Sequence, residues 1–389
     1  MADHDEPRFA TQTIHGGDQW SVAENAIFPA IVTTSSFAKR DLSDQPRYTY
    51  SRAGNPTRHA YESCLAELEG GSGAVACSAG VAATNLALEL LPKDSHVIAM
   101  AGVYGGTFRL LQDYRSRTAG VSASYVDLND LAAVQAALRD NTRMIWVESP
   151  TNPLLTLVDL QRITDFARTH GLLTCIDSTF CSPWNQRPIV DYGMDLVMHS
   201  ASKYIGGHTD LTGGVVVART PELHHQLRNI AMATGCIQGP FDCYLGLRGL
   251  KTLALRMERQ GSNAAHIAEH LAHHAAVDQV FYPGLASHPQ HALCQRQMRS
   301  GGAVVSIKLK AGSERFDAFL GALRLFVLAD SLGGVESMIN HSYSMSHNSM
   351  SREEKLAQGI TENLFRLSVG IEDVRDLTAD LDRALAMLT

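Results

Sequence analysis

The sequence alternates short strand-like runs with longer amphipathic segments between residues 75 and 217, and this alternation constrains the fold more than any other feature. The intervening segments, such as residues 131–138 and 160–169, have apolar positions at helical spacing. Alternation on this scale predicts an α/β fold with a mostly parallel sheet flanked by helices, whose ligands bind at the carboxyl ends of the strands. The expected strands are residues 75–77, 96–100, 122–126, 144–147, 172–176, 196–198 and 215–217.

The pattern changes near Leu247. From about residue 241 to 271 the helical spacing is long and charged on one side. Beyond it come an apolar run at residues 303–309, a strand-like run at 364–369 and a closing helix from about 373 to 388. These later elements predict a second, smaller α+β domain, with a boundary near Leu247.

Composition excludes several functional classes. A net charge of −7 without a long Lys/Arg run gives no electrostatic footprint for nucleic acid or an anionic membrane. The most apolar stretch, residues 74–91, is too polar to span a bilayer and is interpreted as strand, turn and helix. The polar, acidic start MADHDEPRFA is unlike a secretory signal, and the seven cysteines show no CxxC spacing, so we expect reduced thiols in a cytoplasm.

The segment HSASKYIGGHTDLTGG, residues 199–214, places Lys203 directly after a predicted strand, among small hydroxyl residues and glycines. A catalytic Schiff-base lysine needs such a place, near donors for a phosphate and with backbone able to pass close to a cofactor. Ser200, Ser202 and Gly206 supply these features. The alternative is a surface turn with a solvated lysine.

The segment CIDSTF ends the strand 172–176 with Asp177. A carboxylate at the end of a buried strand is costly unless it has a cationic partner. A protonated pyridine nitrogen is such a partner, and the pairing makes the ring an electron sink. The distance along the chain to Lys203 leaves room for one crossover between neighbouring strands. The alternative is a carboxylate that caps the next helix. Together the two segments predict a pyridoxal 5'-phosphate enzyme.

Eight sequence segments, in the order in which they occur along the chain, carry a resemblance to a known family. They are YSRAGNPTR (50–58), SAGVAAT (78–84), VYGGTFRL (103–110), ESPTNP (148–153), CIDSTF (175–180), SASKYIGGH (200–208), SLGGVES (331–337) and LFRLSVGIED (364–373). Along nearly its whole length the chain resembles the Cys/Met-metabolism family of pyridoxal-phosphate enzymes, which includes cystathionine γ-synthase, cystathionine γ-lyase, methionine γ-lyase and cystathionine β-lyase. The resemblance implies a fold-type I transferase-like fold, pyridoxal 5'-phosphate as cofactor and an amino-acid substrate.

The resemblance also implies an assembly and a domain organisation. Tyr50 and Arg52 are expected to reach the phosphate of the neighbouring subunit's cofactor, and the guanidinium fork of arginine suits phosphate oxygens. The partner is then a second copy of the chain, in a homotetramer built from dimers that share active sites. The expected parts are an N-terminal arm at residues 1–51 that reaches the neighbouring subunit, a cofactor-binding α/β domain at 52–247 and a C-terminal α+β domain at 248–389.

Further cofactor contacts follow from the matched segments. Gly80 and Val81 are expected to offer backbone N–H groups to the phosphate at a helix N-terminus, where unpaired donors and the helix dipole favour anions. Ser200 and Ser202 add hydroxyls. Lys203 is the expected attachment point.

The matched segments also imply roles around the ring and the substrate. Tyr104 is expected to stack on the pyridine ring and to act as an acid or base, with a simple turn aromatic as the alternative. Asn152 and Thr179 are expected at the polar periphery of the ring. Arg366, with Ser331, is expected to hold the substrate α-carboxylate.

In the implied reaction Lys203 removes the Cα proton, and desolvation together with the cationic cofactor depresses its pKa so that it can serve as a base. Loss of a γ-substituent, assisted by Tyr104, leads to 2-oxobutyrate and ammonia or to capture by a thiol. We therefore expect γ-elimination or γ-replacement on a substrate such as cystathionine or an O-acyl homoserine.

Three positions depart from relatives within the family. Thr49 stands where cystathionine-handling relatives usually carry an acid, and Asp330 stands at a position that is commonly Glu. Gly106 replaces the cysteine that is typical of methionine γ-lyases. Thr49 and Asp330 count against recognition of the distal amino group of cystathionine. Gly106, within the segment Tyr104–Thr107, and Arg109 resemble the γ-synthase and γ-lyase branch, and a less common cationic γ-substituent such as that of canavanine is expected to face Asp330. Methionine γ-lyase and cystathionine β-lyase activities are the alternatives.

Two more distant alternatives come from other classes. Residues 266–270 fit the inverted zinc-peptidase pattern HxxEH. They lie, however, in an Ala-rich helical segment with four histidines, which is more typical of a solvated helix face, and we expect no metal. A non-catalytic binding protein on the same scaffold is the other alternative, since a fold does not guarantee activity.

Overall fold

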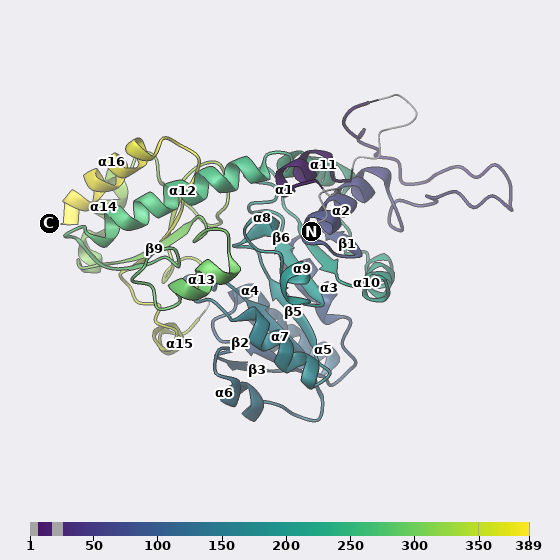
Figure 1. Cartoon of the computed structure of the whole chain (residues 1–389), viewed down its shortest axis with the longest axis horizontal. Coiled ribbons are helices and arrows are strands. Elements are labelled where there is room, and N and C mark those ends of the chain that lie inside the picture. The colour runs from purple at the N-terminus through teal and green to yellow at the C-terminus, as the bar shows by residue number, and fades with distance from the viewer. Residues whose placement is uncertain (1–6, 18–25, 349, 389) are drawn as a thin grey trace, which may run out of the picture.

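The computed structural model describes residues 7–17, 26–348 and 350–388, and it contains two β-sheets, each with its own helices (Figure 1). The larger sheet has the strand order β1-β7-β6-β5-β4-β2-β3 and the smaller has β10-β11-β12-β9-β8. This arrangement confirms the predicted α/β fold with a second α+β region.

Each of the seven predicted strands is present in the larger sheet. Their bounds are β1 Gly73–Cys77, β2 His96–Met100, β3 Ser122–Val126, β4 Thr142–Glu148, β5 Leu173–Asp177, β6 Leu196–Ser200 and β7 Gly214–Ala218. Neighbouring strands from β6 to β3 run parallel, whereas β7 is antiparallel to both β1 and β6. The connection from β6 to β7 contains no helix, and without such a crossover the chain returns in the opposite direction.

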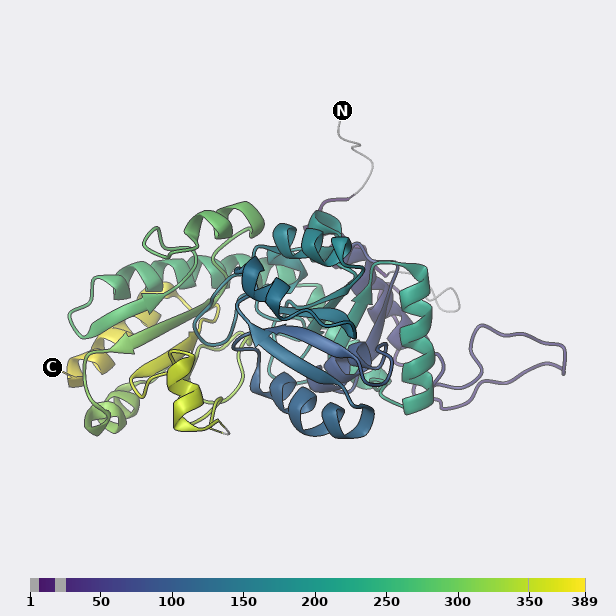
Figure 2. The same ribbon diagram turned by 90° about the horizontal axis from the view of Figure 1, so that it is seen from below.

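Helices lie on both faces of this sheet (Figure 2). The first of them, α2, begins where Asn55 accepts hydrogen bonds from two backbone N–H groups, with Pro56 as its first residue, and ends at Gly70 in a left-handed conformation. The helices of this region are α2 Pro56–Glu69, α3 Gly80–Leu88, α4 Gly105–Arg109, η1 Leu110–Arg115, α5 Ser116–Ala119, α6 Leu131–Ala136, α7 Leu160–Thr169, α8 Ser182–Asn185, α9 Pro188–Tyr192, α10 Pro221–Thr234 and α11 Pro240–Leu250.

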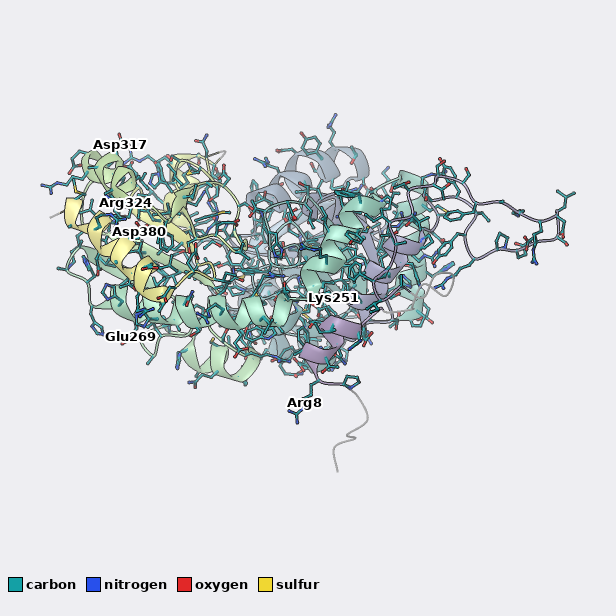
Figure 3. All side chains as sticks on the ribbon, turned by 90° about the horizontal axis from the view of Figure 1, so that it is seen from above. Arg8, Lys251, Glu269, Asp317, Arg324 and Asp380 are labelled. Carbon is teal, nitrogen blue, oxygen red and sulfur yellow. The ribbon has the colours of Figure 1, made fainter. Side chains whose placement is uncertain are left out.

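The smaller sheet is antiparallel except for the pair β10 and β11. Asp380 ties its helices together, because its carboxylate accepts backbone N–H groups of Arg324, Leu325 and Phe326 (Figure 3). The bounds are α12 Leu253–Ala272, β8 Val277–Phe281, α13 His291–Gln297, β9 Val304–Leu309, η2 Ser313–Arg315, α14 Phe316–Ala322, β10 Val327–Leu328, β11 Met338–His341, α15 Arg352–Ala357, β12 Leu364–Ser368, α16 Val374–Leu385 and η3 Ala386–Leu388.

The long helix α12 joins the two regions. Leu253 and Met257, near its start, belong to the core around the larger sheet, whereas Ile267 and Leu271 belong to the core around the smaller sheet. Leu247, the predicted boundary, lies one helix earlier in α11. The domain limits therefore stay a prediction.

The N-terminal segment is only partly in contact with the body. Helix α1, Phe9–His15, is held by Lys251, whose Nζ donates to the carbonyl of Ile14 (Figure 3). The chain from residue 26 to the start of α2 includes a long excursion away from the sheets, visible in Figures 1 and 2. Residues 1–6 and 18–25 of the predicted arm lie outside the described residues. Among the described residues, no helix combines the length and the apolar character needed to cross a membrane.

Candidate active site

A cavity of about 870 Å³ lies at the carboxyl ends of β4, β5 and β6, where the smaller region closes over the larger sheet. This is the place where ligands of a parallel sheet are expected. Twelve of the residues predicted from the sequence line it. They are Gly80, Val81, Tyr104, Asn152, Asp177, Thr179, Ser200, Ser202, Lys203, Asp330, Ser331 and Arg366.

Lys203 follows β6 and extends into this cavity, so the alternative of a solvated lysine in a surface turn is wrong. Its Nζ donates to the Ser331 hydroxyl at 2.6 Å. Burial lowers the pKa of Lys203 to about 8, and the nearby Arg366 guanidinium acts in the same direction. An amine with this pKa exchanges protons readily near neutral pH, as a catalytic base must.

Asp177 ends β5 as a buried carboxyl group, and it does not cap a helix. Its Oδ1 accepts the backbone N–H of Thr179 at 3.0 Å, and the next helix, α8, begins only at Ser182. Burial raises the pKa of Asp177, while Thr179, His199 and Lys203 act in the opposite direction. A carboxylate in such a place gains from a cationic ligand in the cavity.

A second buried carboxyl group, Glu148, lies beside Asp177, because the two residues are register partners across β4 and β5. Its two oxygens accept the backbone N–H groups of Tyr104 at 2.7 Å and Asn152 at 3.3 Å. Burial raises the pKa of Glu148 to about 8, and the charge of Asp177 adds to this rise. Since two adjacent negative charges are unfavourable in a buried site, the pair of Glu148 and Asp177 retains a proton more readily than two exposed carboxyl groups would.

The N-terminus of α3 forms a cradle of backbone donors beside β6. No side chain caps this helix at Ala79, so its first N–H groups are available to an anion. A Cβ atom at Gly80 would come within 2.9 Å of Ser200 Oγ, which explains the glycine there. Ser202 Oγ accepts the backbone N–H of Gly213 at 3.0 Å, which orients the hydroxyl at the same edge.

Arg366 on β12 is buried, with one N–H of each terminal nitrogen engaged. These bonds go to Asn152 Oδ1 at 2.9 Å and to the Ser331 carbonyl at 2.7 Å, while its buried Nε–H has no partner among the residues that the structure describes. Burial lowers the pKa of Arg366 to about 10. Ser331 has a φ of +90°, a strained conformation for a residue with a side chain, which places its hydroxyl at Lys203. A buried cation with an unpaired N–H is suited to bind a carboxylate.

Tyr104 precedes α4 at the mouth of the cavity. Its backbone is fixed by Glu148, whereas its side chain is 43% exposed. A Cβ atom at Gly106 would lie 2.4 Å from Tyr104 Cε1, so the glycine allows the ring to lie where it does.

Thr49, Tyr50 and Arg52 do not line this cavity. Arg52 donates to the carbonyl of Met232 and its guanidinium lies 5.5 Å from the centre of the Tyr50 ring. Within one copy of the chain these residues are therefore not brought to Lys203. Their predicted role requires a neighbouring subunit and stays a prediction.

Several residues of the cavity wall were not predicted. Glu148 could have been found by the rule that singled out Asp177, since it also ends a buried strand. Arg109 and the segment 345–348 have no such local signal. His347, within that segment, is buried, and burial lowers its pKa to about 4, so it is neutral beside Arg366.

The HxxEH residues lie on α12 and none of them lines this cavity; Glu269 lies on the exposed side of the helix (Figure 3). His270 Nε2 lies 2.6 Å from Asp382 Oδ1, and Glu269 pairs with His273. Within the described residues no three His, Cys, Asp or Glu side chains converge as metal ligands.

The fold and the cavity define a class of protein: a pyridoxal-phosphate enzyme of fold type I. The model of the Cys/Met metabolism PLP-dependent enzyme family matches residues 10–386, and the chain belongs to this family. It is 45% identical to the cystathionine β-lyase of Coxiella burnetii over 96% of this chain and 97% of that protein. It is 42% identical to the cystathionine γ-lyase of Bacillus subtilis over 96% and 98%.

A solved structure agrees with this assignment. Cystathionine γ-synthase from Xanthomonas oryzae pv. oryzae, in complex with aminoacrylate and cysteine, superposes with a TM-score of 0.96 at 42% identity, covering 98% of this chain and 99% of that one. The chain is therefore a PLP-dependent enzyme of the cystathionine lyase and synthase type, and the alternative of a non-catalytic binding protein is wrong.

Proposed function

We propose that the enzyme catalyses γ-elimination or γ-replacement on a γ-substituted L-amino acid, with Lys203 as the cofactor-bearing lysine and the base. The observation that carries this proposal is the position of Lys203 Nζ, which lies in one cavity with Asp177, Ser331 and Arg366. To bind an amino acid on this cofactor and to remove its proton, an enzyme requires two charged residues and an amine with a lowered pKa.

The cavity fits the proposed placement of the cofactor. Asp177 offers a buried carboxylate to the pyridine nitrogen, and the cradle at Gly80 and Val81, with Ser200 and Ser202, offers donors to the phosphate. When bound, pyridoxal phosphate withdraws electrons from the Cα of the substrate. A single negative charge on the pair of Asp177 and Glu148 would lie at the ring and favour the protonated nitrogen.

We assign the substrate carboxylate to Arg366. Its unpaired Nε–H and its terminal N–H groups can form charge-assisted bonds, and Asn152 Oδ1 accepts one terminal N–H, which helps to hold the guanidinium in place. Ser331 positions Lys203 through their 2.6 Å contact. With the carboxylate fixed at Arg366, the neutral amine of Lys203 removes the Cα proton and later returns it.

The proposed role of Tyr104 is to protonate the departing γ-substituent. Tyr104 lines the cavity and is partly exposed, and the Glu148 contact holds its backbone in place. Gly106 supports a γ-lyase or γ-synthase over a methionine γ-lyase, since a cysteine at this position would displace the Tyr104 ring from its present place.

Asp330 is the proposed selector of the γ-substituent. Its carboxylate lines the cavity and accepts a hydrogen bond from Asn340 Nδ2 at 3.0 Å. A negative charge here favours substrates with a distal cation, such as cystathionine or, with its guanidino-oxy group, canavanine. Thr49, which adds no charge, is assigned to the same end of the site in the neighbouring subunit.

A second candidate is β-elimination of cystathionine, favoured by the 45% identity to a cystathionine β-lyase. Both reactions need the same base and the same carboxylate site. They differ in product, since γ-elimination gives 2-oxobutyrate and β-elimination gives pyruvate.

The test is a steady-state comparison of cystathionine, O-acyl homoserines, methionine, homocysteine and canavanine, with the keto acid identified by chromatography. We expect 2-oxobutyrate, or a thioether when a thiol is added, from at least one of the γ-substituted substrates. Asp330→Asn should selectively lower kcat/KM for substrates with a distal cation, while Asp317→Asn, on the surface helix α14, serves as the control. Rapid pyruvate formation with failure of every γ-substituted substrate would overturn the proposal.

We propose a homotetramer of dimers with shared active sites, located in the cytoplasm. The support for shared sites is that Tyr50 and Arg52 lie outside the cavity of their own chain. The support for a reducing compartment is the absence of disulfides among the described free thiols Cys77, Cys175, Cys181, Cys236, Cys243 and Cys294.

A further inference from the structure

Cys77 and Cys236 form a pair of thiols that the proposed reaction does not use. Cys77 is the last residue of β1, and Cys236 follows the end of α10. The backbone N–H of Gln238 donates to the carbonyl of Ala76 at 3.0 Å, which holds the segment carrying Cys236 against the end of β1. The two thiols are within hydrogen-bonding reach of each other.

The environments of the two sulfurs differ. Cys77 is fully buried, whereas Cys236 is half-buried and can be reached by a small solute. The neighbouring Cys77 thiol lowers the pKa of Cys236 to about 6, and the Thr234 hydroxyl acts in the same direction, against the effect of burial. The thiolate is the reactive form of cysteine, so Cys236 is poised to act as a nucleophile, with Cys77 as its neighbour.

The other thiols provide a contrast. Cys175, Cys181 and Cys243 are fully buried, and burial raises the pKa of each of them. Burial also raises the pKa of Cys294, to about 11. These four remain protonated at neutral pH, so an oxidant distinguishes Cys236 from them.

We propose that Cys77 and Cys236 are a dithiol modification site, which a hydroperoxide oxidises to an intramolecular disulfide. The Cys236 sulfur attacks a peroxide oxygen, the O–O bond breaks, and the departing oxygen takes a proton, which leaves a sulfenic acid. The Cys77 sulfur then attacks the Cys236 sulfur, the S–O bond breaks and water leaves. Two thiols are oxidised to one disulfide, and the hydroperoxide is reduced to an alcohol and water, or to two waters for hydrogen peroxide.

The position of Cys77 gives this oxidation a consequence. The next residues, 78–80, lead directly into the cradle at α3, and they are closely packed against β7. A Cβ atom at Gly214, the register partner of Cys77, would come within 2.3 Å of the Ala79 carbonyl oxygen. Pulling Cys77 toward Cys236 therefore shifts the backbone N–H groups of Gly80 and Val81. This consequence rests on the proposed function, whereas the disulfide itself does not.

The experiment treats the holoenzyme with limiting hydrogen peroxide, alkylates the remaining thiols and maps the peptides by mass spectrometry. We expect a Cys77–Cys236 cross-linked peptide that disappears with dithiothreitol. The loss of one charge-assisted hydrogen bond to the phosphate should accelerate cofactor release on dilution about tenfold, reversibly. Cys236→Ser should form no cross-link and keep its basal activity, while Cys294→Ser, the matched control, should still form it.

Two results separate the claims. If peroxide oxidises Cys236 while Cys77 remains fully alkylated, or if neither is oxidised before the protein unfolds, the modification site is refuted. If the disulfide forms and cofactor release is unchanged, the coupling to the cradle is refuted and the modification site stands. In Cys77→Ala, the sulfenic acid on Cys236 should be trapped by dimedone. If Cys77→Ala does not fold, because Cys77 is buried, the absence of the cross-link in Cys236→Ser still tests the proposal.

Discussion

Arg366→Lys isolates the contribution of the guanidinium fork to substrate binding. In the structure Arg366 is buried, donates to Asn152 Oδ1 and to the Ser331 carbonyl, and keeps an Nε–H that no described residue accepts. Lysine keeps the charge but can offer one hydrogen bond where the fork offers two. A charge-assisted hydrogen bond contributes about 1.5–3 kcal/mol. We therefore expect kcat/KM to fall about 10- to 150-fold.

The assay compares an amino-acid substrate with the same substrate lacking its α-carboxylate. The wild-type enzyme should prefer the amino acid strongly, and Arg366→Lys should lose most of that preference while it retains its cofactor content. Arg296→Lys serves as the control, since Arg296 is an exposed residue paired with Asp159. An unchanged preference in Arg366→Lys, or a loss that follows cofactor content alone, would refute the assignment of the carboxylate to Arg366.

Three further predictions concern the same cavity. Glu148→Gln keeps an acceptor for only one of the N–H groups of Tyr104 and Asn152, so kcat should fall about tenfold. Burial raises the pKa of Glu148 to about 8, so the folded state binds its proton between pH 4.5 and 8, and the wild-type protein should lose stability as pH rises through this window. Thermal unfolding should show that Glu148→Gln lacks this loss. Gly106→Cys should move the Tyr104 ring, lowering kcat for γ-elimination with little change in the binding of an unreactive amino acid, which calorimetry measures; equal kcat would contradict this reasoning. In the cofactor-free chain burial lowers the pKa of Lys203 from 10.5 to about 8, so the free energy of unfolding should rise by about 3 kcal/mol as pH increases between these values. Lys203→Met should lack this rise, which chemical denaturation at pH 7 and pH 10.5 measures; an equal pH dependence in both proteins would contradict the reasoning.

The sheet and its ligand edge were predictable because they follow from local periodicity. Strands such as β2 and β5 are short apolar runs, and Asp177 and Lys203 directly follow or end such runs, where a polar residue is informative. The reversal of β7 was not predicted, because a short apolar run has the same appearance in either direction.

The rest of the site depends on distant parts of the chain. Arg366 was assigned to the substrate only through the family resemblance, since nothing in its local sequence distinguishes it from another arginine on a strand. Its contacts to Asn152 and Ser331 arise from packing of the two regions. The approach of Cys236 to Cys77 also joins segments far apart in sequence, and no local pattern encodes it. The proposed role of Tyr50 and Arg52 also depends on a distant part, a neighbouring copy of the chain.

The attachment of the cofactor to Lys203 is tested most directly by reducing the freshly purified holoenzyme with borohydride, digesting it and locating the modified residue by mass spectrometry. The account predicts loss of the yellow colour and one pyridoxyl group, on the peptide containing Lys203, with none in Lys203→Met. A pyridoxyl group on another lysine, or a wild-type protein that takes up no pyridoxal phosphate when reconstituted, would contradict it.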